Sequence, residues 1–493
     1  MVTDARAIPT PGGVDRLAAA RVPPIPSGAR ARVAAIKRAV ERWMADPRFR
    51  QAFAEQPAAA LRERQLTAVP EALVELVSEL ERPRAPVSDE RAPTHPDARR
   101  YRAYLDTLRR HREAIRALGE PDDRRMRRWR ARQIERCTSE LGPVAGRGIV
   151  HAPIAFELSN GCSVGCRFCA VSAPGLADIF SYTPANARLW RTVLAAVHTR
   201  FGDAGAAGFC YWATEPLDNP DYERFCADFA TEFGRPPPTT TALAARALDR
   251  ARALARQGLR EGVVHRFSVL SLGMLDRLHA AFTPEELLGV ELTPLNRGSI
   301  LRYSNAGRAR ARYANESEGP PRDVPGTIAC VTGFLVNMVD RRVRLISPTQ
   351  ATEDWPLGYR VYAERHFDDG PGFAAALAEL IERAMPLALP AHGPLRFRPD
   401  LRWTERADGF DLANEHVVHR VRLPDLAAAL GQAIVGEALS PVAAAERLGG
   451  SRVADMAKVH ALLTCMFDRG LFDDAPASPP GVPQRPQFSL PVL

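Results

Sequence analysis

Several features are missing from this chain of 493 residues, and each absence excludes a class of protein. No stretch approaches the roughly 20 apolar residues that a membrane-spanning helix needs, and no signal peptide opens the chain. The eight cysteines follow no regular framework, which argues against a disulfide scaffold of the extracellular kind. We therefore expect a cytoplasmic protein without a membrane partner.

The positive charge is local rather than general. The formal net charge is +8, but residues 97–136 alone carry 14 arginines against 7 acidic residues. A basic helical face of this kind can hold an acidic peptide or a nucleic acid. The alternative is an ordinary solvent-exposed helix in a proteome rich in arginine. We favour this alternative for residues 97–136.

Three cysteines in eight residues are the most informative motif that is present. Cys162, Cys166 and Cys169 have the spacing C-x3-C-x2-C, and thiolates are the usual ligands of iron–sulfur clusters. Three thiolates leave one iron of a four-iron cluster open for chemistry. A structural zinc site is the alternative, but zinc takes four protein ligands and no second Cys or His pair stands nearby.

This motif resembles the signature of radical S-adenosylmethionine (SAM) enzymes. The resemblance implies a [4Fe-4S] cluster held by the three cysteines, with SAM as a second cofactor and an external electron donor such as flavodoxin or ferredoxin. It also implies an α/β fold with a partial (β/α)6 barrel, in which the cysteine loop follows the first strand.

The order of apolar segments fits that expectation, because alternating strands and helices indicate a parallel sheet. The pattern predicts strands at 154–158, 208–213, 238–241, 265–270 and 290–293, and helices at 192–201, 221–233, 242–257 and 272–281.

Candidate SAM contacts follow the ends of these strands. Ala213-Thr214-Glu215-Pro216 resembles the Gly-Gly-Glu-Pro element of the family, which implies that Glu215 binds the methionyl ammonium of SAM by a charge-assisted hydrogen bond. Ser268, Ser271, Glu291 and Asn296 are further candidate contacts to cofactor or substrate. A serine at a strand end is also a common helix cap.

The segment 327–349, which contains Cys330 near its start, reads as strand, turn and strand. It resembles the hairpin that opens the auxiliary-cluster extension of peptide-modifying radical SAM enzymes. Thr349 stands where the second cysteine is expected, and only Cys465 follows. Two thiols cannot hold a further four-iron cluster, so Cys330 is free for another role. Nothing suggests a cobalamin domain, which disfavours methylation.

Trp355-Pro356-Leu357-Gly358-Tyr359 also resembles the radical SAM peptide epimerases of polytheonamide (proteusin) maturation. The resemblance implies conversion of L-residues to D-residues in a ribosomally made precursor peptide, with one cysteine outside the cluster motif as hydrogen donor. Cys330 is our candidate donor, and a packed strand cysteine is the alternative. Cys465 lies on an apolar helical stretch and is expected in the core.

We predict the following organisation: a flexible tail (1–30), a helical leader-like domain (31–81), a linker (82–97), a basic helical segment (98–149), the partial barrel (150–325), a hairpin extension without an auxiliary cluster (326–390), a winged-helix-like domain (391–475) and a tail (476–493). The run from Asp46 to Leu66 resembles the leader region of nif-eleven-type precursors, with an ordinary helical hairpin as the alternative.

The winged-helix-like domain is expected to bind the leader of the precursor peptide as an added strand. Its last helix, at 452–469, has balanced charge, which disfavours nucleic acid. Two rival functions remain: another radical modification of a peptide, such as cross-linking or decarboxylation, and a non-catalytic scaffold that binds a leader or DNA.

Overall fold

The computed structural model describes residues 15–81, 93–313, 324, 326–424, 426–437, 439–450 and 452–476. Most of the expected linker, most of the C-terminal tail and the first 14 residues of the N-terminal tail lie outside these residues. Within the expected first tail, α1 spans Arg16–Ala19 and α2 begins at Ser27. No helix in the described part is long and apolar enough to cross a membrane.

The helices near the N-terminus form a small unit with its own core. They are α2 (Ser27–Ala45), α3 (Pro47–Glu55), α4 (Pro57–Glu63) and α5 (Pro70–Glu81). Asp46 caps the start of α3, because its carboxylate accepts hydrogen bonds from the backbone of Arg48 and Phe49. Helix α6 (Pro96–Leu118) packs Tyr101 and Tyr104 into the same core, and α7 (Arg124–Gly148) follows.

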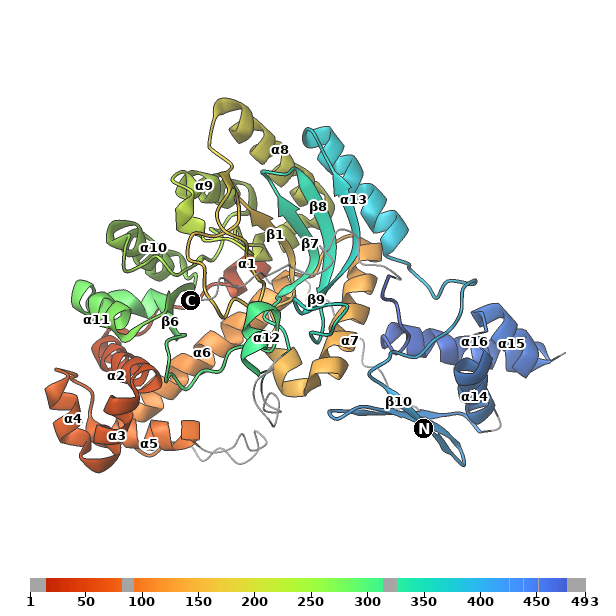
Figure 1. The fold of residues 1–493 in the computed structure, drawn as a ribbon, viewed down its shortest axis with the longest axis horizontal. Coiled ribbons are helices and arrows are strands. Elements are labelled where there is room, and N and C mark those ends of the chain that lie inside the picture. The colour runs from red at the N-terminus through yellow and green to blue at the C-terminus, as the bar shows by residue number, and fades with distance from the viewer. Residues whose placement is uncertain are drawn as a thin grey trace, which may run out of the picture.

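Two sheets make up the centre of the molecule (Figure 1). In the first, β1 (Ala152–Glu157) pairs in parallel with β7 (Val331–Asn337), and β8 (Arg342–Pro348) and β9 (Tyr359–His366) continue it in antiparallel fashion. The second contains β4 (Thr240–Thr241), β5 (His265–Val269) and β6 (Val290–Pro294), all parallel. A short pair, β2 (Ser159–Asn160) and β3 (Asp178–Ile179), flanks the cysteine loop.

The mixed α/β class is confirmed, and the described strands do not close into a barrel. The strand predicted at 208–213 is reduced to one parallel bridge between Phe209 and Ala155. The predicted hairpin is confirmed as β7 and β8, and β7 pairs with β1 at the edge opposite Phe209. A partial (β/α)6 barrel remains a prediction.

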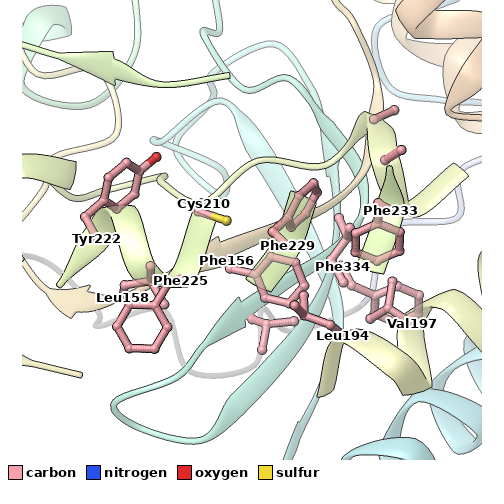
Figure 2. Close-up of a cluster of buried hydrophobic side chains, with 14 of the residues drawn as sticks. Phe156, Leu158, Leu194, Val197, Cys210, Tyr222, Phe225, Phe229, Phe233 and Phe334 are labelled. Atoms are coloured by element: carbon pink, nitrogen blue, oxygen red, sulfur yellow. The ribbon is translucent and has the colours of Figure 1, made fainter. Parts of the chain in front are cut away.

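Helices cover one face of the first sheet. They include α8 (Pro184–Phe201), α9 (Tyr222–Phe233) and α13 (Gly370–Ala384), while α10 (Leu248–Glu261) and α11 (Leu272–Ala281) follow β4 and β5. Figure 2 shows Phe156 and Phe334 of the sheet among Phe225, Phe229 and Phe233 of α9. Burial of each such aromatic side chain stabilises the fold by about 1.5–3 kcal/mol. This face is therefore structural, and the opposite face is left for the site.

The C-terminal unit is a three-stranded sheet followed by three helices. Strands β10 (Arg402–Arg406), β11 (Gly409–Ala413) and β12 (Val418–Arg422) are antiparallel. They share a core with α14 (Ala427–Glu437), α15 (Pro441–Gly449) and α16 (Val453–Asp468). Figure 1 places this unit and the helices α2–α5 at opposite ends of the long axis.

Candidate functional site

The cysteine loop begins directly after β1 and β2, and its path depends on glycine. Gly161 has φ +86°, and a Cβ there would lie 2.2 Å from the carbonyl oxygen of Gly175. No residue with a side chain fits such a close backbone approach. The backbone N–H of Cys162 donates to the carbonyl of Pro174 at 2.9 Å, and that of Cys169 donates to the carbonyl of Cys166 at 3.2 Å.

The start of α12 (Gly307–Tyr313) holds the loop from the other side. The Arg308 guanidinium donates to the carbonyl of Cys166 (Nε, 3.1 Å) and to that of Ala173 (Nη1, 2.7 Å). Its backbone N–H donates to the carbonyl of Cys169 at 3.0 Å. The Phe168 ring stacks on Tyr303 with centroids 4.2 Å apart. Sequence analysis missed Arg308, because its role depends on a contact across more than a hundred residues.

The three thiols are half-buried and close to one another. Burial raises the pKa of Cys166 to about 11, and the neighbouring Cys169 and Cys162 act in the same direction. In the described part of the chain, no three His, Cys, Asp or Glu side chains are placed to hold a single metal ion. Each thiolate of a four-iron cluster binds a different iron, so its ligands need not converge on one point. The donor set, three neighbouring thiols on one glycine-shaped loop, fits such a cluster.

Glu215 lies beside this loop but is already engaged with the protein. Its carboxylate is 3% exposed and accepts hydrogen bonds from the Thr241 hydroxyl, from the Ala242 backbone at 2.8 Å and from the Leu217 backbone at 3.1 Å. Burial raises the pKa of Glu215, and its charge contributes to the raised pKa of Cys162. A carboxylate has about four acceptor positions, so room for one further donor remains.

The other predicted cofactor contacts are dispersed. Ser271 caps α11 by accepting a hydrogen bond from the Met274 backbone at 3.2 Å, which is the alternative weighed for it above. Ser268 is half-buried on β5 opposite Thr293. The amide of Asn296 donates to the carbonyl of Ala45 at 2.8 Å. It therefore fastens the segment after β6 to the end of α2.

Cys330 lies at the opposite end of β1 from the cysteine loop. Its carbonyl accepts a hydrogen bond from the backbone of Ala152, the first residue of β1, at 2.8 Å. The six residues of β1 correspond to a length of about 20 Å at roughly 3.3 Å per residue. Cys330 packs against the same buried apolar cluster as Tyr211, Trp212 and Leu357, and this cluster is separate from the one that contains α8 and α9.

A polar cluster surrounds this thiol, which we call the Arg266 cluster: Tyr211, Thr240, Arg266, Glu291 and Cys330. Arg266 Nε donates to Glu291 at 3.0 Å, and the Thr240 hydroxyl donates to Tyr211 at 2.8 Å. Burial raises the pKa of Cys330 to about 11, and the charge of Arg266 acts in the opposite direction. The thiol is therefore protonated at neutral pH. Of this cluster, sequence analysis found only Glu291 and Cys330.

The remaining cysteines lie outside the site. Cys210 is buried in the apolar cluster of Figure 2, and its thiol contacts that of Cys226. Cys137 is buried in α7. The prediction that Cys465 belongs to the core is wrong, because its side chain is exposed. It occupies the outward side of α16, between the buried Leu463 and Met466.

A separate cleft of about 500 Å³ lies between α7 and the C-terminal sheet. We call it the polar cleft because most of its lining residues are polar or charged: Glu140, Gln350, Asp400, Arg402, Ala413, Asn414, Glu415 and His416. Glu140 and Asp400 are neutralised by Arg136 and Arg398. None of the cysteines lines this cleft, which is separate from the cysteine loop.

Comparisons with known proteins identify one relative of unknown activity. No protein-family model matches the chain. An uncharacterized protein of Sinorhizobium fredii, y4wI, is 43% identical over 328 residues, which is 64% of this chain and 63% of that protein. The chain thus spans less than two thirds of that relative's length. Among solved structures, BtrN in complex with AdoMet and 2-DOIA matches with a TM-score of 0.29 and 16% identity, over 47% of this chain and 82% of that one. A similarity with so low a TM-score does not establish a shared fold.

Proposed function

We propose that this protein is a radical SAM peptide epimerase, which converts L-residues of a ribosomally made precursor to D-residues. The observation that carries the proposal is the three-cysteine loop, whose neighbouring thiols on a glycine-shaped turn fit a four-iron cluster. Inversion at a carbon needs hydrogen removal on one face and hydrogen return on the other, and Cys330, which carries a protonated thiol, is our candidate for the return. Its backbone adjoins the start of β1 and the loop follows the end of that strand, about 20 Å away, so SAM and the peptide residue would have to lie between them.

Cys162, Cys166 and Cys169 would hold the [4Fe-4S] cluster, with SAM bound at its open iron and at Glu215. When bound, this pair of cofactors supplies a 5′-deoxyadenosyl radical that takes the Cα hydrogen of an L-residue. The Cys330 S–H bond then breaks, and its hydrogen atom joins the flattened Cα from the other face. The product is a D-residue of unchanged mass, and Cys330 is left as a thiyl radical.

The thiyl radical must be reduced before the next turnover. One electron from a donor such as flavodoxin or ferredoxin and one proton from solvent restore the thiol, so atoms and electrons balance. Arg266 and Tyr211 contact the space around Cys330, and we assign them to positioning the thiol and the peptide. The Arg266–Glu291 ion pair keeps the guanidinium fixed in this role.

The C-terminal unit would recognise the leader of the precursor. Strands β10 and β12 pair only with β11 in the described part of the chain, so each has an open edge to which an extended peptide can add. Val418 on β12 is 53% exposed, and the polar cleft adjoins the turn between β11 and β12. These features support peptide binding at a distance from the cysteine loop.

The test is an anaerobic assay of reconstituted enzyme with SAM, dithionite and the candidate precursor in deuterium oxide. Peptide mass and chiral amino-acid analysis are the readouts. A gain of one mass unit per D-residue, with deuterium at Cα, is the expected result. A loss of two mass units would indicate cross-linking instead, and another net loss would indicate a reaction such as decarboxylation. Absence of 5′-deoxyadenosine with every peptide would favour a non-catalytic scaffold.

A further inference from the structure

A buried arginine without an acceptor lies at the start of the second sheet. Arg235, on the segment between α9 and β4, is 3% exposed. Its Nε and Nη1 atoms have no hydrogen-bond partner among the described residues. A buried, uncompensated charge costs several kcal/mol by order of magnitude, so proteins rarely retain one without a counter-charge. We therefore expect the Arg235 guanidinium to have an acceptor that does not belong to the described residues.

His265 adds a third unpaired donor. The backbone N–H of Thr239 donates to its Nδ1 at 3.2 Å. This bond assigns the ring proton to Nε2, and Nε2 is buried without a partner. Thr239 lies four residues after Arg235 on the same segment, and the charge of Arg235 acts on His265, so the two side chains belong to one region. The region thus presents donors and no complementary acceptor.

The surrounding charge has a single sign. Burial lowers the pKa of His265 to about 4, and the positive charges of Arg235 and Arg266 lower it further. The pKa of His111 on α6 is likewise lowered to about 4, by burial and then by Arg235. Burial and the charge of Arg21 lower the pKa of Arg235 to about 10. No carboxylate forms an ion pair with Arg235 in the described part of the chain.

The N-terminal segment encloses this region. Gly234, next to Arg235, packs against Leu17 of α1, and the backbone N–H of Val22 donates to the carbonyl of Gly262 at 2.9 Å. α1 and the residues after it therefore lie over the segment between α9 and β4. The cysteine loop follows β1 and lies outside this enclosure.

We propose that Arg235 and His265 bind a small oxyanion, of the phosphate or carboxylate class, beneath the N-terminal segment. The guanidinium Nε and Nη1 of Arg235 form a fork that matches two oxygens of such an anion, and His265 Nε2 donates to it as well. The site is independent of the proposed reaction, since it needs neither the cluster nor SAM. The anion would fasten α1, α6 and β5 together.

The test is calorimetric titration of the full-length protein with inorganic phosphate, at constant ionic strength maintained with chloride, and in parallel with acetate. We expect saturable binding of one anion per chain, and affinity at least about tenfold lower in Arg235→Gln, a loss of about 1.4 kcal/mol. Arg256→Gln, which removes an exposed arginine of α10, is the matched control and should bind as wild type.

Phosphate binding without acetate binding would assign a phosphate site, and the reverse a carboxylate site. No saturable binding by either anion, or equal binding by Arg235→Gln, would overturn the proposal and leave water as the partner of these donors. If Arg235→Gln fails to fold, a crystal of the wild-type protein in selenate decides. An anomalous peak within hydrogen-bond reach of Arg235 supports the site, and its absence rejects it. The assay contains no SAM or reductant, so its outcome is separate from that of the epimerase assay.

Discussion

The carbonyl of Cys330 accepts a 2.8 Å hydrogen bond from the backbone of Ala152. This bond joins the residue that precedes β7 to the first residue of the strand that leads to the cysteine loop. The parallel pairing of β1 and β7, which has one register shift between Ala152 and Ile154, therefore sets the distance between Cys330 and the loop. The predictions below begin with this thiol.

Replacement of Cys330 by alanine should abolish formation of D-residues and leave cleavage of SAM. The variant lacks the returning hydrogen, whereas the cysteine loop and Glu215 are unchanged. Chiral analysis of the peptide and quantification of 5′-deoxyadenosine separate the two effects. Cys465→Ala is the matched control, because that thiol is exposed on α16; it should behave as wild type. Full D-residue formation by Cys330→Ala would reject the assignment of the donor.

The thiol of Cys330 also predicts a pH dependence of stability. Its pKa is about 11 in the folded chain against an ordinary value of 9.0, so the folded state binds the proton more tightly. The contribution is complete below about pH 9 and is lost between about pH 9 and 11, by about 2–3 kcal/mol in total. The free energy of unfolding of wild type minus that of Cys330→Ala should fall over this interval. A difference that stays constant to pH 11 would contradict it.

Two glycines of the cysteine loop make a matched pair. Gly161→Ala places a Cβ 2.2 Å from a backbone oxygen, whereas Gly165→Ala, at φ +61°, meets no atom within 4 Å. Gly165→Ala should lower the stability by only about 1–2 kcal/mol, which is the cost of placing an alanine in the left-handed conformation. We expect Gly161→Ala to lose most of its bound iron after reconstitution and Gly165→Ala to retain most of it. Iron and sulfide analysis measures this, and equal iron contents would show that the close approach at Gly161 is not needed.

Arg308 should be required for a well-formed loop. Arg308→Ala removes two hydrogen bonds to loop carbonyls, each worth about 1.5 kcal/mol or more because the donor is charged. Reduced iron content and faster proteolysis within residues 160–175 are the expected results. Arg310→Ala is a suitable control, since Arg310 donates to Thr352 and not to the loop. Unchanged iron in Arg308→Ala would contradict the role assigned to it.

The polar cleft should contribute to binding of the leader. Arg402 lines the cleft and is exposed, and charge reversal in Arg402→Glu should weaken leader binding about tenfold, or about 1.4 kcal/mol. Fluorescence anisotropy with a labelled leader peptide measures this. Lys458→Glu, on the exposed side of α16, controls for net charge. Equal weakening by both variants would point to a nonspecific charge effect.

Helices and strands were predicted best where one face of the element is buried, because burial of one face leaves a periodic pattern of apolar residues in the sequence. Strand β5 was predicted within one residue, because buried and half-buried side chains alternate along it. The strand near 238–241 is shorter than predicted and begins at Thr240, since Pro236–Pro238 lack the N–H groups that pairing requires. The helix predicted from 242 begins at Leu248, because Thr241 and Ala242 bind Glu215 instead.

The candidate site was predictable only in part, because some of its contacts join segments that are far apart in the sequence. The position of the cysteine loop after β1 follows from local pattern. Arg308 and Tyr211 reach the loop and Cys330 through contacts between distant segments, which no local period encodes. Asn296 was predicted to face a ligand, yet it bonds to Ala45; the sequence contains no sign that α2 docks at that point.

The pairing of β1 with β7 also has a consequence during synthesis. Residues 152–157 leave the ribosome well before residues 331–337, which supply the main pairing partner of β1. Pairing across so long a separation is intrinsically slow, so the strand that carries the cysteine loop stays without its main partner for about 180 residues of translation. Insertion of a cluster is therefore expected late, after the hairpin has emerged, and a nascent chain stalled before residue 331 should not retain iron.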